Sequence, residues 1–195
     1  LTDKINTSSL ALADTMSFYD DRVLLTLGAR RQTIEQTTFA YNTGLQTSDY
    51  DESKTTPVAG IVFKATPEVS IYGNYIEGLV KGNVAPTVAN NLPVVNGGQA
   101  FAPSQTKQTE VGVKYESGGL GASAAYFDTK QPNFFIVNQV YGPNGEQRNR
   151  GLEFMLYGEP VKGLRLLGGL TLLDAEQVDT VGGLTDGKDV IGIPN

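Results

Sequence analysis

The sequence predicts an all-β fold, an antiparallel up-and-down meander of about eight strands. Two observations carry this prediction. Several segments alternate apolar and polar residues with a period of two, which is typical of strands that bury one face. Short and long links between these segments follow one another in strict alternation. In addition, no apolar run approaches the ~20 residues that a membrane helix needs.

Four segments show the alternation most clearly. In segment 107–116, Val111, Val113 and Tyr115 lie on one face, and Glu110 lies on the other. The remaining clear segments are 22–32, 150–158 and 164–173. Weaker alternation predicts four more strands, at 8–18, 55–64, 69–77 and 120–129.

Asp14 interrupts the pattern of the first predicted strand. It shares a face with Leu12 and Met16, where an apolar residue is expected. We expect either that Asp14 lies near the rim of the apolar face or that the strand shifts register there.

The links between the strands are more informative than the strands. The short links are 19–21, 65–68, 117–119 and 159–163, and Gly, Pro and Asp supply their turn geometry. The long links, rich in Gly, Asn, Pro and Thr, are 33–54, 78–106, 130–148 and 174–192. Strict alternation places all short turns at one end and all long loops at the other. This arrangement is typical of an outer-membrane β-barrel, with short periplasmic turns and long extracellular loops.

A soluble all-β ligand-binding or adhesion module is the alternative, because soluble sandwiches also alternate apolar and polar residues. Two features favour the barrel. Soluble sheets rarely carry four such long loops at one end. The polar face also carries charged residues that suit a wet lumen, among them Arg30, Lys64, Glu110, Lys114 and Glu153. Dependence on detergent would distinguish the two alternatives.

Composition narrows the function classes. The net charge of −6 argues against a nucleic-acid partner, because phosphate binding needs a basic face. The sequence has no Cys and no His, the residues that most transition-metal sites and acid–base mechanisms use. We therefore expect no enzyme, no catalytic residue and no metal site.

Two short motifs are better read as ordinary loops. Residues 182–188 have the glycine and lysine spacing of a phosphate-binding loop, but Asp189 stands where Ser or Thr should bind magnesium. Asp49, Asp51 and Glu52 are acidic but lack the spacing of a calcium loop.

Several segments, in their order along the chain, resemble one known family. They are 10–18 with 21–30, 57–64 with 69–78, 107–116 after Pro103, 148–153, the turn 160–163, 170–176 and 192–195. Together they resemble the β-barrel domain of TonB-dependent ferric-siderophore receptors, most closely the hydroxamate branch that takes ferrichrome and coprogen. The resemblance covers nearly the whole chain, and segment 192–195 resembles the start of a following strand.

The resemblance implies a location, partners and a larger protein. Such receptors lie in the bacterial outer membrane, and a plug domain fills their 22-stranded barrel. The sequence shows neither a plug nor a TonB-binding box, so we expect residues 1–195 to be part of the barrel domain only. The implied partners are a ferric siderophore, membrane lipid and, through the plug, the TonB complex. Iron would arrive as the siderophore chelate, so no cofactor is expected.

An eight-stranded piece of a larger barrel would have two open edges with unpaired backbone groups. Such edges invite pairing with another strand. We therefore expect the sheet to close on itself or to self-associate.

The candidate ligand-binding residues are aromatic side chains in the polar long links: Tyr41, Phe101, Phe134, Phe135 and Tyr141. The resemblance implies that loop and upper-barrel aromatics help to hold the siderophore. An organic chelate offers apolar surface with few polar handles, which suits aromatic walls. The alternative is that these side chains only pack the loops against the strands.

Overall fold

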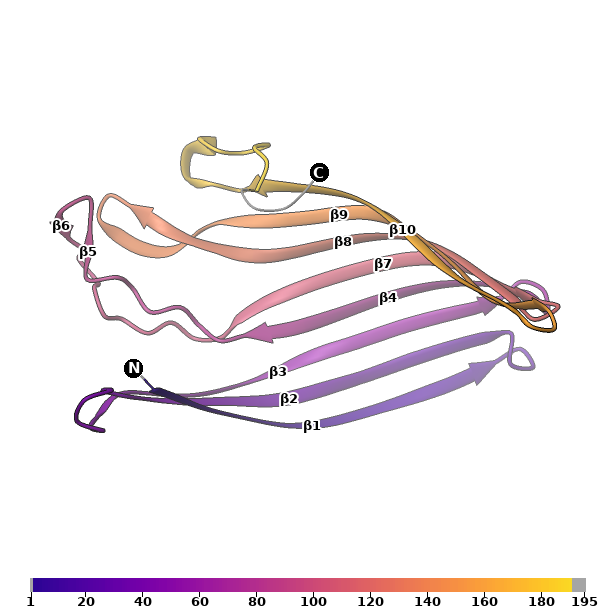
Figure 1. Ribbon diagram of the computed structural model, residues 1–195, viewed down its shortest axis with the longest axis horizontal. Helices are drawn as coiled ribbons and strands as arrows, with labels where there is room; N and C mark the ends of the chain where they lie inside the picture. Colours follow the sequence, from indigo (N-terminus) through magenta and orange to yellow (C-terminus); the bar gives the residue numbers. More distant parts are fainter. Residues whose placement is uncertain (1, 191–195) are drawn as a thin grey trace.

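The computed structural model describes residues 2–190 and places them in one curved antiparallel sheet. The eight strands follow chain order, which confirms the predicted meander (Figure 1). They are β1 (Thr2–Phe18), β2 (Val23–Phe39), β3 (Gln46–Lys64), β4 (Val69–Val80), β7 (Ser104–Ser117), β8 (Leu120–Val137), β9 (Val140–Val161) and β10 (Leu164–Val178). Strands β5 (Val88–Ala89) and β6 (Leu92–Pro93) form a separate small hairpin. The strand start expected at 192–195 lies outside the described residues.

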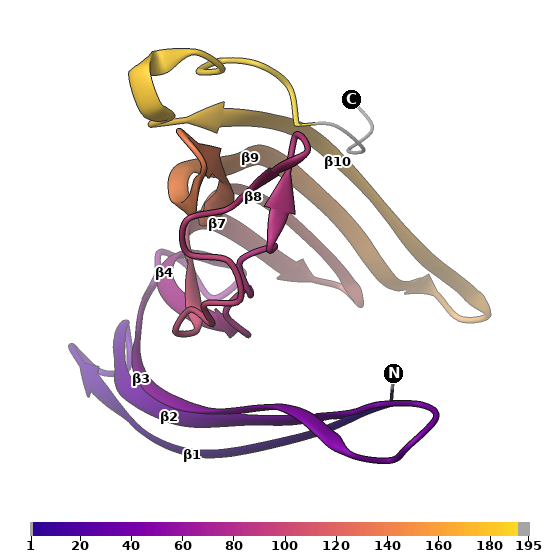
Figure 2. The same ribbon diagram turned by 90° about the vertical axis from the view of Figure 1, so that its left-hand side faces the viewer.

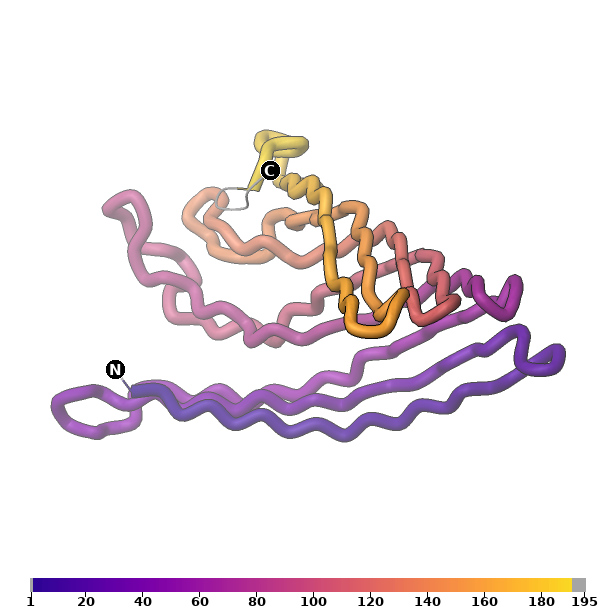
Figure 3. Tube along the Cα trace, turned by 45° about the vertical axis from the view of Figure 1, so that its right-hand side comes forward, coloured from indigo at the N-terminus to yellow at the C-terminus, as the bar shows by residue number. Residues whose placement is uncertain are grey.

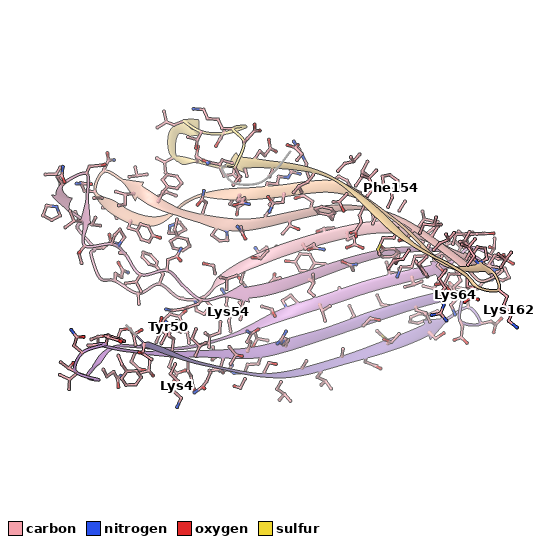
Figure 4. The ribbon with its side chains drawn as sticks, in the orientation of Figure 1. Lys4, Tyr50, Lys54, Lys64, Phe154 and Lys162 are labelled. Carbon is pink, nitrogen blue, oxygen red and sulfur yellow. The ribbon has the colours of Figure 1, made fainter. Side chains whose placement is uncertain are left out.

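Strand pairing gathers the apolar residues on one face, because directly paired residues point to the same side. One row crosses all eight strands with every neighbour paired: Met16, Leu25, Ile61, Gly73, Val111, Tyr126, Leu152 and Leu172. Figure 2 shows the curvature of the sheet, and in Figure 4 Phe154 of the neighbouring row points away from its hollow side. We call this convex side the apolar face.

The sheet is a single layer without a closed hydrophobic core. None of the described side chains is fully buried, and large apolar side chains such as Leu12 (82% exposed) and Leu170 (58%) remain uncovered. A soluble sandwich would bury these side chains against a second sheet. The soluble-module alternative is therefore not supported, whereas a lipid-facing wall accounts for the exposed apolar face.

The opposite, hollow face carries a polar network, as the alternation predicted. Tyr72 donates a hydrogen bond of 2.6 Å to Glu110, and Gln108 donates to the same carboxylate at 3.3 Å. Thr129 in turn donates to Gln108 at 3.3 Å. Because polar groups on this face satisfy one another, it suits contact with water.

The four short turns lie at one end of the sheet, which we call the turn end (right in Figure 1). Gly118 and Gly119 form a two-residue hairpin turn with φ of 58° and 80°, a geometry that glycine adopts without strain. At residues 19–21, three consecutive non-glycine residues adopt φ of 53–64°.

At the opposite end, the loop end, the prediction of four long loops is partly wrong. Links 33–54 and 130–148 are mostly strand, and their turns are only 40–45 and Asn138–Gln139. Figure 3 shows the β2–β3 hairpin reaching beyond the start of β1. Segment 81–103 remains a long loop, and residues 179–190 form a shorter one that contains the 3₁₀ turn Val181–Gly183. Among the described residues, no helix is long and apolar enough to cross a membrane.

The sheet divides at Pro57. Strands β3 and β4 pair only from Val58–Ile76 to Lys64–Ser70, although β3 continues to Gln46 beside β2. Proline has no N–H to donate, so it is tolerated where a strand becomes an edge. From Pro57 toward the loop end, strands β1–β3 therefore separate from strands β4–β10.

Two expectations about edges and register need correction. Strands β1 and β10 lie at opposite edges of the described sheet, so it does not close on itself; self-association remains a prediction. The β1–β2 register is continuous and pairs Asp14 with Leu27. Because Leu10 and Leu12 continue the same face beyond it, Asp14 interrupts the apolar face of an edge strand rather than marking its rim.

Candidate functional site

Loop 81–103 is the largest feature of the loop end, and it crosses the gap between β3 and the β8–β9 hairpin (Figure 2). The β5–β6 hairpin lies within it and turns through Asn90 and Asn91, with φ of 51° and 61°. Asn adopts this left-handed geometry more readily than most residues. An isolated bridge between Val84 and Ala100 closes the base of the loop.

The first anchor of the loop is Tyr50 on β3. The backbone N–H of Gly82 donates a 3.0 Å hydrogen bond to the Tyr50 hydroxyl, and the ammonium of Lys81 lies 5.3 Å from the centre of the ring. Tyr50 is only 7% exposed, and this burial raises the pKa of its phenol, against the opposing effect of the Gly82 hydrogen bond. No Cβ would fit at Gly82 beside the carbonyls of Phe101 and Ala102.

The second anchor joins the loop to the tip of the β8–β9 hairpin. The Asn96 side chain donates to the carbonyl of Tyr141 at 2.8 Å and accepts from its N–H at 2.9 Å. The Val95 N–H donates to the carbonyl of Gln139 at 2.8 Å. An asparagine side chain thus pairs with the hairpin as a neighbouring strand would.

Three of the five predicted aromatic residues meet between these anchors. The ring of Phe101 lies 5.3 Å from that of Phe134 and 5.9 Å from that of Tyr141, both at steep angles. The rings of Phe134 and Tyr141 are 5.8 Å apart. We call these three residues the aromatic cluster; its geometry lies in the range of favourable aromatic pairs.

The aromatic cluster borders a cavity of about 560 Å³ at the loop end. Phe101 and Phe134 form part of its wall, with Pro132 and Pro143 beside them. Its charged lining residues are Lys54, Lys107, Lys130 and Glu146. The cavity therefore combines aromatic surface with an excess of positive charge, which suits an organic anion with apolar groups.

Tyr41 and Phe135 stand apart from the aromatic cluster. Tyr41 lies in the β2–β3 turn with 79% of its surface exposed. Phe135 follows Phe134 on β8, and successive strand residues point to opposite faces. The ligand-binding role of all five residues stays a prediction.

Sequence reasoning missed both anchors, Tyr50 and Asn96. Tyr50 falls in link 33–54, whose composition predicts a loop, whereas the structure buries it on strand β3. Asn96 precedes two glycines, a common loop composition, and only the folded chain brings it to Tyr141.

Residues 182–188, which have the spacing of a phosphate-binding loop, form a turn that contains Asp186. The Asp186 carboxylate accepts hydrogen bonds from the backbone N–H and the hydroxyl of Thr180, at 2.8 and 2.6 Å, and so organises its own loop. These bonds lower the pKa of Asp186. No group of three or more acidic, His or Cys side chains in residues 2–190 could hold a metal ion.

Comparison with known proteins places this geometry in context. The family model described as "TonB dependent receptor-like, beta-barrel" matches residues 2–195. The chain is 40% identical over 197 residues to the ferrichrome receptor FcuA of Yersinia enterocolitica, covering 100% of this chain and 26% of that protein. It is 31% identical over 135 residues to the metal-pseudopaline receptor CntO of Pseudomonas aeruginosa, covering 66% of this chain and 18% of that protein.

Among solved structures, the crystal structure of BauA, the ferric preacinetobactin receptor from Acinetobacter baumannii, is similar with a TM-score of 0.79 and 40% identity. That match covers 98% of this chain and 28% of BauA. The chain thus spans about a quarter of the length of FcuA and of BauA.

Proposed function

The chain belongs to the TonB-dependent receptor β-barrel family of the bacterial outer membrane, and from this membership we propose that it forms eight barrel strands of a ferric-siderophore uptake receptor. The observation that carries this proposal is the 40% identity, over essentially the whole chain, both to a ferrichrome receptor and to a ferric preacinetobactin receptor. In the complete receptor, β1 and β10 would pair with further strands of the barrel.

The arrangement of the two ends supports an orientation. Tight turns fit the periplasmic side of such a barrel, and the longer hairpins and loop 81–103 fit the exterior, where the ligand arrives. The aromatic cluster and the cavity beside it would then lie at the extracellular end of the barrel, on the side of the sheet that carries Lys107 and Lys130.

The chemistry of the described residues fits a ligand that carries its own iron. A siderophore already chelates the metal, so the wall needs only surfaces that recognise the organic shell. Aromatic side chains and lysines provide such surfaces at the loop end. Energy would come from the TonB complex acting on a plug domain elsewhere in the complete receptor.

Transport by the full-length receptor tests this proposal. The receptor is expressed in a bacterial strain that lacks its own siderophore receptors, and cells are given ⁵⁵Fe-loaded ferrichrome, coprogen or preacinetobactin. We expect energy-dependent uptake of at least one chelate, and no uptake in a matched strain without TonB. Uptake that persists without TonB, or binding of none of the three chelates, would refute the proposal.

A further inference from the structure

Strand β3 has an unpaired edge at the loop end, in the middle of the described sheet. Its pairing with β4 begins only at Val58–Ile76, whereas its pairing with β2 continues to Phe39–Gln46. In Figure 1, β3 and β4 move apart toward the left. Further strands of the complete receptor would add at β1 and β10, so they would not cover this edge.

Hydrogen bonds at the turn end of β3 show which backbone groups point to each side. The Lys64 N–H donates to the carbonyl of Arg22 at 2.8 Å, and the Ala65 N–H donates to the carbonyl of Val69 at 2.9 Å. Alternate residues of an antiparallel strand bond to the same neighbour, so even-numbered residues of β3 bond to β2. The N–H and C=O groups on the other side therefore belong to odd-numbered residues. We call four of these residues the open edge: Asp49, Asp51, Ser53 and Thr55.

Loop 81–103 does not pair with the open edge. Within residues 2–190, no backbone hydrogen bond joins the loop to these four residues. The loop contacts β3 through the side chain of Tyr50, an even-numbered residue on the hollow face. From Asp49 to Thr55 the open edge is roughly 20 Å long, which is enough for a strand of ordinary length.

The open edge is acidic at the end farthest from Pro57. Asp49 and Asp51 are exposed on the convex side, and Asp51 stands directly opposite Glu35 of β2. Like charges in directly opposed positions destabilise a sheet. Asp49 accepts a hydrogen bond from Thr37 at 3.3 Å, but no ion pair within the described residues includes any of the three carboxylates.

Toward Pro57 the charge changes sign. Arg31 of β2 lies on the same side of the sheet and donates a 2.8 Å hydrogen bond to the hydroxyl of Ser53. A cationic partner therefore fits beside Asp49 and Asp51, whereas a neutral one fits beside Ser53.

We propose that the open edge binds an extended, cationic segment of another polypeptide by strand addition. The segment runs antiparallel to β3, as β4 does, and its backbone pairs with the open edge. Two lysine or arginine side chains at alternate positions stand beside Asp49 and Asp51, and they relieve the repulsion between Asp51 and Glu35. Pro57, which has no N–H to donate, and the β3–β4 ladder below it end the pairing.

A second copy of this chain fits the open edge less well than a cationic segment does. Two receptors in one membrane present β3 in the same direction, so direct pairing would be parallel. It would bring Asp49 and Asp51 of both copies together, and charged edges of this kind oppose self-pairing. The loop end fits the exterior in the orientation proposed above, so the partner is an extracellular polypeptide. The inference does not depend on which chelate the receptor carries.

Peptide binding to the full-length receptor tests the proposal. The receptor, purified in detergent, is titrated with a dye-labelled peptide of threonine and valine that carries two lysines separated by one residue, and fluorescence anisotropy reports binding. In an antiparallel pair, the residue that bonds to Asp51 through its backbone also places its side chain beside Asp51. Methylation of the backbone nitrogens of the lysines should therefore abolish binding. Methylation of the residues that alternate with them should not.

A proline variant places the peptide on the open edge. Ser53→Pro removes an N–H from the open edge while the bonds to β2 remain, and it should prevent binding. Ser53→Ala is the matched control: it loses the same hydrogen bond from Arg31 but keeps the N–H, so it should bind as the unmodified receptor does.

A charge variant tests the acidic half of the open edge. Asp49→Asn/Asp51→Asn should bind the peptide about fivefold more weakly. Asp20→Asn/Asp21→Asn makes the same change of net charge in a short turn at the opposite end of the sheet, where asparagine tolerates the left-handed backbone, and should leave binding unchanged.

Hydrogen–deuterium exchange of residues 46–57 separates the possible occupants. The peptide should protect this segment, which should exchange more readily in the receptor alone. Full protection in a monomeric receptor without peptide would assign the open edge to loop 81–103. Protection in a dimer that Ser53→Pro dissociates would assign it to a second copy. Either result would overturn the proposal, as would equal binding of the two methylated peptides or no binding of the unmethylated one. Every readout is taken without siderophore or TonB, so its failure is distinct from failure of transport.

Discussion

Asn96 pairs with the backbone of Tyr141 through both polar atoms of its side chain, at 2.8 and 2.9 Å. This contact fastens loop 81–103 to the tip of the β8–β9 hairpin and holds Phe101 of the loop near Phe134. The aromatic cluster therefore depends on a polar residue outside it.

Replacing Asn96 by alanine should release this part of the loop. The two hydrogen bonds to Tyr141 are lost, and so is a third, to Gln99 within the loop. At about 1 kcal/mol for each bond, local opening becomes easier by about 2–3 kcal/mol. Hydrogen–deuterium exchange of residues 94–101 and 139–141 in the full-length receptor measures the change. Asn42→Ala, in the exposed β2–β3 turn, is the control and should leave these segments unchanged. Equal protection in both variants would show that Asn96 does not fasten the loop.

Truncation of Phe101 should weaken ligand binding. Phe101→Ala removes the ring that contacts both other members of the aromatic cluster, and we expect about tenfold weaker binding of the transported ferric siderophore. Isothermal titration of the purified receptor measures the affinity. Tyr41→Ala removes an exposed aromatic residue outside the aromatic cluster and should change affinity by about twofold or less. A larger loss in Tyr41→Ala would move the contact site to the β2–β3 turn.

A charge on the apolar face should destabilise the wall. Phe154→Arg places a guanidinium against lipid, which costs on the order of 2–4 kcal/mol near the bilayer midplane. Glu153→Arg puts the same side chain on the polar face one residue away and should cost little. Urea titration of the full-length receptor in lipid vesicles compares the two free energies of unfolding. Similar losses in both variants would contradict the assignment of the faces.

The loop at 179–190 should respond to acid through Asp186. Its hydrogen bonds with Thr180 lower the pKa of the carboxyl below the ordinary 3.8. Because the pKa is lowered on folding, the stabilising contribution is present above the ordinary value and is lost as the pH falls through the lowered one. The loop should therefore keep its structure at pH 5 and loosen only in strong acid.

A neutral variant mimics this loss at pH 7. In Asp186→Asn, the backbone amides of Thr180 and Gly187 should exchange faster with deuterium, whereas Asp179→Asn, at the first position of the same loop, should not have this effect. Unchanged exchange in Asp186→Asn would remove Asp186 as the organiser of the loop.

Much of the sheet could be predicted because lipid and water impose opposite demands on its two faces. Segments such as 107–116 and 150–158 show period two and lie within strands β7 and β9. The extensions at 33–39 and 46–54 could not be found in this way. Their residues are mostly polar on both faces, yet they are strand because backbone pairing between β2 and β3 continues to Phe39–Gln46. A period of two appears only where the two faces of a strand meet different surroundings, and in these extensions both faces meet water.

The candidate site was predictable by residue type but not by arrangement. Aromatic side chains in polar links identified Phe101, Phe134 and Tyr141, which do meet. Tyr41 stays apart from them. Tyr50 and Asn96 hold the loop through contacts between residues about 30 and 45 positions apart in sequence. Local composition carries no record of such contacts.

The division at Pro57 has a mechanical consequence. Seven residue pairs join β3 to β4 near the turn end. On the loop-end side of Pro57, the described hydrogen bond from Gly82 of loop 81–103 to Tyr50 connects strands β1–β3 with strands β4–β10. The short β3–β4 pairing can therefore act as a hinge between these two groups of strands, and loop 81–103 holds them together at the loop end. Displacement of the loop would let the two groups of strands move apart at the loop end, while the β3–β4 pairing near the turn end stays intact.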